Sequence, residues 1–169
     1  NFLLKQTLTT VEATGIPYYL VDETLQKGDT FSTRLNNAFQ EVFNLGYAHV
    51  IAVGSDCPQR GSQDLLLSRQ LVERNNICLG PDTHGGVHLL GLSKQIFEAG
   101  ILNGISWNTA RVFKQVSRFL KKENIQHQPI SVYADINSSP DLLTNLNNRT
   151  TKNSLPHHPP PQLALLTND

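Results

Sequence analysis

Residues 50–58 read Val-Ile-Ala-Val-Gly-Ser-Asp-Cys-Pro, and this stretch decides the fold. Its small and β-branched apolar residues predict a strand buried on both faces, which is typical of parallel sheets. Pro58 has no amide hydrogen to donate, so the strand ends before it. Ligands of open α/β sheets bind at the carboxyl ends of strands, so we expect Gly54, Ser55 and Asp56 to line a site.

A second stretch, residues 79–86, reads Leu-Gly-Pro-Asp-Thr-His-Gly-Gly and ends another apolar strand in the same way. Gly85 and Gly86 allow a ligand to approach the backbone closely. Asp82 and His84 offer metal-binding or general-base groups in the same loop. Two such strand ends facing one crevice predict a site for a phosphorylated ligand and a divalent metal. A tight hairpin turn with polar side chains is the alternative interpretation of this loop.

Strand and helix patterns alternate along the chain, which predicts the α/β class: a Rossmann-like three-layer sandwich with a mainly parallel sheet. A hairpin-like pair across Gly85 and Gly86 is expected to add an antiparallel element. Strands are expected over 17–21, 48–53, 77–79, 87–92 and 129–133, and helices over 2–14, 31–45, 62–75, 94–99 and from Asn108 or Thr109 to Glu123. We assign residues 1–146 to one domain, with a helix starting at Ser139, and residues 147–169 to a Pro-rich tail that is disordered or extended.

Composition narrows the class of protein. The formal net charge is zero and the basic residues are scattered, which argues against a nucleic-acid partner. No apolar run reaches the ~20 residues of a membrane helix, so no membrane partner is expected. Two cysteines are too few for a disulfide framework, and a reducing cytoplasm is the expected location. The chain contains no methionine, which indicates a processed chain or a fragment.

Each remaining candidate residue has two interpretations. Asp56 binds a metal or caps the helix expected near Ser62, and Asp135 reaches the same crevice or is an ordinary turn residue. Trp107 and Asn108 contact a sugar or base, or Trp107 is a packing anchor. Two residues are expected to have a structural role: Cys57 as a buried small hydrophobe, and His88 in the half-buried core. His157 and His158 lie in the tail and are not assigned a metal-binding role.

The motifs together resemble one bacterial family that is similar to glycosyltransferase-A and nucleotidyltransferase folds, often labelled nucleotide-diphospho-sugar transferase-like. The resemblance rests on Gly54–Pro58, on Gly80-Pro81 followed by Gly85-Gly86, and on Ile105-x-Trp107-x-Thr109, and it runs from Phe2 to Leu143.

The resemblance implies a nucleotide sugar or nucleotide as ligand, Mg²⁺ or Mn²⁺ held near Asp56 and placed with help from Asp135, and group transfer to an acceptor. Asp82 and His84 are the catalytic candidates. The substrate-binding candidates are Gly54, Ser55, Gly85, Gly86, Trp107, Asn108 and Thr109.

The sequence departs from the family pattern at three places. The family begins with a strand and a nucleotide-cradling loop, whereas this chain begins at the helix that follows them. His84 and Asn137 stand where the family usually has Asp. These departures support an alternative: a catalytically degenerate, non-enzymatic binding or dimerisation domain, in which a homodimer or strand exchange covers the sheet edges that a missing strand exposes. A third interpretation is that the sequence starts late and the native protein carries the full site.

Overall fold

The apolar strands assemble into one five-stranded sheet in a computed structural model that describes residues 2–133 and 162–166. Its strand order is β1-β5-β2-β4-β3. The strands are β1 (Tyr18–Val21), β2 (His49–Gly54), β3 (Ile77–Pro81), β4 (Val87–Ser93) and β5 (Gln162–Leu166). β2, β3 and β4 coincide closely with the apolar runs expected to form strands, and β2 ends at Gly54.

The sheet is mixed. β5 pairs in parallel with both β1 and β2, whereas β4 pairs antiparallel with both β2 and β3. The α/β class is confirmed, but the expectation of a mainly parallel sheet is not. The reason lies in the turn at residues 82–86, which is too short for a crossover and returns the chain as a hairpin, so that β4 runs against its neighbours.

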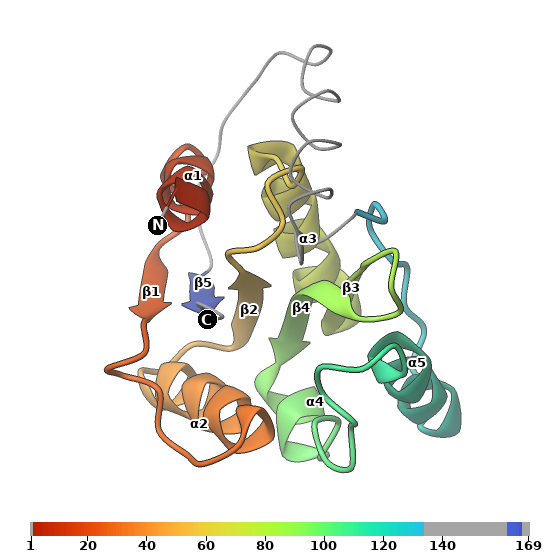
Figure 1. Ribbon diagram of the computed structural model, residues 1–169. Helices are drawn as coiled ribbons and strands as arrows, with labels where there is room; N and C mark the ends of the chain where they lie inside the picture. The colour runs from red at the N-terminus through yellow and green to blue at the C-terminus, as the bar shows by residue number, and fades with distance from the viewer. Residues whose placement is uncertain (1, 134–161, 167–169) are drawn as a thin grey trace.

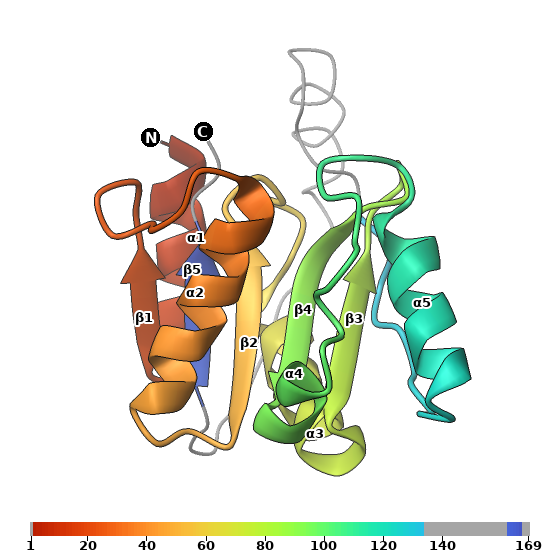
Figure 2. The ribbon, with the colours of Figure 1, turned by 90° about the horizontal axis from the view of Figure 1, so that it is seen from below.

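β5 lies between β1 and β2, inside the sheet rather than at its edge (Figure 2). It comes from residues 147–169, which the sequence assigns to a Pro-rich tail. The family resemblance predicts that a first strand is missing before the helix that leads into β1. In the structure the position beside β1 is occupied by this C-terminal segment.

Helices cover both faces of the sheet, as Figure 1 shows. α1 and α3 lie on one face, and α2, α4 and α5 lie on the other. Their bounds are α1 (Phe2–Glu12), α2 (Phe31–Asn44), α3 (Ser62–Asn75), α4 (Lys94–Glu98) and α5 (Val112–Lys122). The three layers expected from the sequence are therefore present in the part of the chain that the structure describes.

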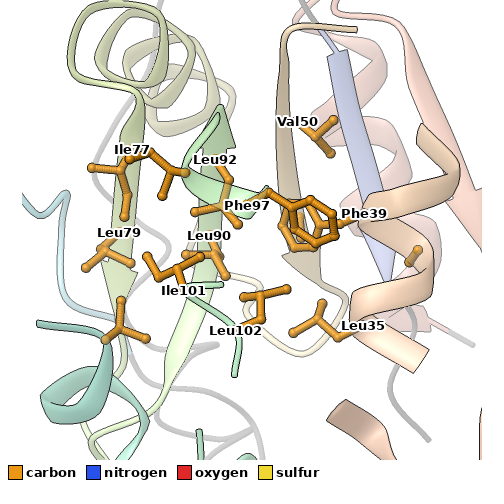
Figure 3. Packing of buried hydrophobic residues seen from close by; sticks show 14 of the residues in the cluster. Leu35, Phe39, Val50, Ile77, Leu79, Leu90, Leu92, Phe97, Ile101 and Leu102 are labelled. Carbon is orange, nitrogen blue, oxygen red and sulfur yellow. The ribbon is translucent and has the colours of Figure 1, made fainter. Parts of the chain in front are cut away.

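Successive side chains of β2 point to opposite faces of the sheet and belong to two different apolar cores. Val50 and Ala52 face the helices α2, α4 and α5, whereas Ile51 and Val53 face α1 and α3. Figure 3 shows part of the larger core, in which Phe39 of α2 packs near Phe97 of α4. The ring centroids of these two residues are 5.8 Å apart. Burial on both faces explains why the stretch at residues 50–53 is continuously apolar.

Local chemistry sets where α2 begins. The hydroxyl of Thr30 accepts a hydrogen bond from the amide of Thr33, and the Thr33 side chain returns a bond to the amide of Thr30. This reciprocal cap satisfies amides that the first helical turn leaves unpaired. The cap fixes the chain direction directly after the loop that follows β1.

Two local expectations are corrected. α5 begins at Val112, not at Asn108 or Thr109, because Asn108 has a φ of 60° and lies outside the helical region of the backbone. Residues 129–133 make isolated bridges to Leu79 and Asp82 rather than a strand, and Pro129 has no amide hydrogen to donate to a ladder. The helix expected from Ser139 lies outside the described residues.

Candidate functional site

The loops that leave β1, β2 and β3 lie at one end of the sheet (Figure 2). Residues 54–58 follow β2, and residues 82–86 connect β3 to β4 at the same end, because β4 starts there and runs back. The N-terminus of α2 and the segment before α5 complete this edge. The two stretches that the sequence singles out are therefore brought to one edge by the fold.

The segment after β2 is held by α1. The Thr7 hydroxyl donates to the carbonyl of Ser55 over 3.4 Å, and the Gln6 side chain donates to the carbonyl of Pro58 over 3.2 Å. Ser55 and Cys57 are buried, while Asp56 between them is half-buried. The carboxylate of Asp56 is therefore carried on a backbone that is fixed on both sides.

Arg60 is a buried residue that the sequence did not single out. Its guanidinium donates to two backbone carbonyls, that of Gly54 at the end of β2 and that of His88 in β4. Its side chain therefore holds the ends of two neighbouring strands together at the candidate site. An isolated Arg in a polar loop carries no periodicity, so no signal in the sequence distinguishes it.

Asp82 shapes the second loop. One of its carboxylate oxygens, Oδ1, accepts from the amides of His84 at 2.6 Å and Gly86 at 2.9 Å. A Cβ on Gly86 would lie 2.2 Å from the other oxygen, Oδ2, so the turn requires glycine there. This geometry matches the hairpin turn left open by the sequence, with Oδ1 holding the turn and Oδ2 lying against Gly86. The His84 side chain is exposed.

The turn after β3 packs against Ala110, which precedes α5, and against the first turn of α5. The amide of Phe113 donates to the carbonyl of Gly85 over 3.0 Å, and a Cβ on Gly85 would lie 2.3 Å from the carbonyl oxygen of Ala110. Gly85 also has a φ of +87°. This close contact brings Gly85 and Gly86 to the segment that holds Trp107, Asn108 and Thr109.

Trp107 packs on the first turn of α2. Its ring centroid lies 5.8 Å from that of Phe31, with the ring planes inclined at 56°. The indole Nε1 is buried and has no hydrogen-bond partner among the described residues. Thr109 uses its hydroxyl locally, donating to the carbonyl of Ser106 and accepting from the amide of Arg111. Asn108 is exposed.

His88 is buried behind the loop at residues 82–86. Its Nε2 lies 3.1 Å from the carbonyl oxygen of Ser131, so Nε2 carries the hydrogen, and Nδ1 has no partner among the described residues. Burial, and after it the charge of Arg60, lower the pKa of His88 to about 4. His88 is therefore neutral at physiological pH, in a core position closer to complete burial than the half-buried one expected.

Tyr133 lies beside His88, with their ring centroids 5.3 Å apart. Its hydroxyl donates to both carboxylate oxygens of Asp64, at 3.1 and 3.0 Å, and burial raises the pKa of Tyr133. Asp64 in turn accepts from the amide of Gly61 at the start of α3. The residues that follow Tyr133, including Asp135, lie outside the described part of the chain, so the structure does not place Asp135 relative to Asp56.

Both cysteines are buried, as expected for Cys57, and they form no disulfide with each other. Burial raises the pKa of the Cys78 thiol to about 11, which makes it a poor nucleophile. Among residues 2–133, no group of three or more His, Cys, Asp or Glu side chains is close enough to hold a metal ion. No helix within the described residues is long and apolar enough to span a bilayer.

The fold and the site edge together define a class: α/β proteins with helices on both faces of a mixed sheet and a loop-lined edge at the ends of β2 and β3. The chain is similar to a crystal structure described as a putative nucleotide-diphospho-sugar transferase from Desulfovibrio desulfuricans G20. That likeness has a TM-score of 0.77 at 20% sequence identity and covers 88% of this chain and 74% of the other. At this level of sequence identity, the likeness shows a shared fold but does not show a shared activity.

Residues 20–109 match the model of the DUF2064 family, described as uncharacterized protein conserved in bacteria. The chain belongs to this family, which confirms the resemblance drawn from its motifs. The match includes the segments at residues 54–58 and 82–86 and ends at Thr109. No curated protein matches this chain.

Proposed function

We propose that this chain binds a nucleotide sugar, or a nucleotide, at the edge formed by residues 54–58 and 82–86, and transfers a sugar or nucleotidyl group to an acceptor. The observation that carries the proposal is the convergence of these two segments at one end of the sheet, in a fold similar to that of a protein described as a putative nucleotide-diphospho-sugar transferase. This edge is the usual ligand-binding position in an open α/β sheet.

The carboxylate oxygens at this edge suit a hard divalent cation as metal ligands. Asp56 offers a half-buried carboxylate on a fixed backbone. Mg²⁺ in nucleotide sites is usually held by one or two carboxylates together with the phosphates. Asp56 and Asp135 would hold Mg²⁺ or Mn²⁺, which would offset the charge that develops on the leaving diphosphate.

Other residues at this edge bind and orient the ligand. Gly54 and Ser55 present backbone at the end of β2, and Gly85 and Gly86 permit close approach from the opposite loop. The exposed imidazole of His84 and the carboxylate of Asp82 would serve as general-base groups toward the acceptor. Trp107, Asn108 and Thr109 contact the sugar or the base.

A second function is favoured by one specific observation. Oδ1 of Asp82 already accepts two backbone amides, so this carboxylate maintains the turn whether or not a ligand is bound. A chain that keeps the turn and lacks a second carboxylate at position 84 fits a non-enzymatic domain that binds a ligand without transferring it.

Isothermal titration of the full chain with UDP, GDP and CDP, each with and without Mn²⁺, tests the proposal. We expect one nucleotide to bind only with Mn²⁺, and Asp56→Asn to weaken it at least tenfold. Glu98→Gln is the matched control, since it removes a carboxylate from the exposed surface of α4, at the opposite end of the sheet. Absence of binding for all three nucleotides would contradict the proposal. Binding without turnover of the corresponding nucleotide sugar would support the non-enzymatic domain.

A further inference from the structure

Arg34, near the start of α2, is a cation whose side chain has no partner among the described residues. The side chain is half-buried, and its Nε is buried without a hydrogen bond. The ion pairs within residues 2–133 join other side chains. A half-buried guanidinium in this state is costly, because its N–H groups lose water and gain no acceptor in return.

Trp107 brings a second unpaired donor to the same turn of α2. Its ring packs on Phe31, and its buried Nε1 has no partner among the described residues. Phe31 and Arg34 are three residues apart in α2, so their side chains are neighbours on the helix surface. Helical side chains lean toward the N-terminus of their helix, so Arg34 extends over the turn that holds Phe31. Two unpaired donors from separate segments therefore lie beside one phenylalanine ring.

Both donors belong to the candidate functional edge. α2 begins at the end of the sheet where residues 54–58 and 82–86 meet, and the segment that holds Trp107 reaches the same end (Figure 2). Leu35, the residue after Arg34, is buried in the larger core. Arg34 therefore lies at the border between this core and the surface of the edge.

The chemistry of these donors selects an anion. A guanidinium only donates, and its planar fork fits two oxygens of one phosphate group. The indole N–H also only donates. The partial positive charge at the start of α2 adds to the preference for an anion. Asp56 and Asp82 bring negative charge to the same edge, so an anionic ligand there needs an opposing cation.

We propose that Arg34 binds a phosphate group of the nucleotide at this edge, with the indole N–H of Trp107 as the second donor. This assignment rests on the proposed function for the identity of the ligand, and on the two unpaired donors for its position. A phosphate oxygen supplies the acceptor that both donors lack in the free protein. Arg34 is a binding residue and takes no part in the proton transfers assigned to Asp82 and His84.

The test uses the full chain and the fluorescence of Trp107, which is the single tryptophan in the sequence. Sodium sulfate is the first probe, because it is a tetrahedral oxyanion without a nucleoside. It is titrated without metal, at an ionic strength held constant with sodium chloride. UDP, GDP and CDP with Mn²⁺ are the second set of probes, followed by calorimetry. The nucleotide titrations are then repeated in saturating sulfate, which shows whether the two ligands compete.

Two substitutions at position 34 separate charge from geometry. Arg34→Gln removes the charge, and we expect it to weaken both sulfate and nucleotide binding at least tenfold. Arg34→Lys keeps the charge without the fork and should bind with intermediate affinity. Arg74→Gln is the matched control, since Arg74 is exposed in the last turn of α3, and it should bind both ligands like the unmodified chain. Thermal unfolding shows whether each variant is folded.

Trp107→Phe tests the second donor, because it keeps an aromatic ring beside Phe31 and removes the N–H. Calorimetry replaces fluorescence for this variant. We expect nucleotide binding about threefold weaker than that of the unmodified chain. Unchanged affinity would remove the indole N–H from the proposed site.

The outcomes separate this proposal from the proposed function. Nucleotide binding that Arg34→Gln leaves unchanged would overturn the proposal and keep the proposed function. Nucleotide and sulfate binding without competition would also overturn it, since the anion at Arg34 would then not be a phosphate of the nucleotide. Sulfate binding that depends on Arg34, with no binding of any nucleotide, would contradict the proposed function and leave only an anion site at Arg34.

Discussion

Arg60 Nη1 donates a hydrogen bond of 2.7 Å to the backbone carbonyl oxygen of His88, and both side chains are buried. The same guanidinium also bonds the carbonyl of Gly54. Arg60 thereby joins the end of β2, which carries Ser55 and Asp56, to the start of β4, which follows the turn at residues 82–86. The two halves of the candidate site are linked through one buried cation.

This relationship predicts how stability depends on pH. The pKa of His88 is about 4 in the folded protein and 6.5 when unperturbed, so the unfolded chain takes up a proton at higher pH than the folded one. Above pH 6.5 the neutral His88 contributes its full share to the free energy of unfolding. This share, about 3 kcal/mol, is lost as the pH falls toward 4. Urea unfolding at several pH values measures it.

The matched variant is His88→Gln, which keeps a side-chain donor for the carbonyl of Ser131 and does not titrate. Its unfolding free energy should fall less steeply between pH 6.5 and 4 than that of the unmodified protein. Identical slopes for the two proteins would show that His88 does not keep its neutral form in the folded state.

Removal of the Arg60 side chain should destabilise the fold. Arg60→Ala leaves the carbonyls of Gly54 and His88 without this donor, and we expect a loss of about 2–4 kcal/mol in unfolding free energy. Arg74→Ala removes an exposed Arg from the last turn of α3 and should change stability by less than about 0.5 kcal/mol. Equal effects of the two substitutions, by denaturant unfolding, would refute a structural role for Arg60.

Two features of this fold can be predicted from the sequence: a buried strand from its apolar residues, and a turn from its glycines. β2 is predictable because Val50 to Val53 are apolar on both faces, and the turn at residues 82–86 because Gly85 and Gly86 permit conformations closed to other residues. Those two signals place both halves of the candidate site at strand ends.

The remaining features depend on long-range contacts that leave no local pattern. Residues 162–166 form a short apolar run beside a Pro-rich stretch, and only the open edges of β1 and β2 make them a strand. The role of Arg60 depends on the register of β2 against β4, which brings the carbonyls of Gly54 and His88 within reach of one guanidinium.

The N-terminal cap of α2 offers a third prediction. Thr30→Ala removes the hydroxyl that accepts from the amide of Thr33, and we expect a loss of about 1 kcal/mol in unfolding free energy. Thr30→Ser keeps the hydroxyl and should retain most of the stability. A serine variant as unstable as the alanine variant, by thermal unfolding, would mean that the methyl group and not the hydroxyl matters here.

Gly85 should tolerate no side chain. Gly85→Ala places a Cβ 2.3 Å from the carbonyl oxygen of Ala110 at a φ of +87°, so strain and collision both oppose it. Gly104→Ala is the matched control, because Gly104 has a φ of +71° and open space around its Cβ position, so it carries the strain alone. That strain costs about 1–2 kcal/mol of unfolding free energy, and Gly85→Ala should lose a further 1–3 kcal/mol.

The collision in Gly85→Ala pushes the turn at residues 82–86 away from the segment with Trp107. Gly85→Ala should therefore also weaken any nucleotide binding, while Gly104→Ala should not. If the two variants unfold at the same temperature, the close contact between Gly85 and Ala110 is absent in solution.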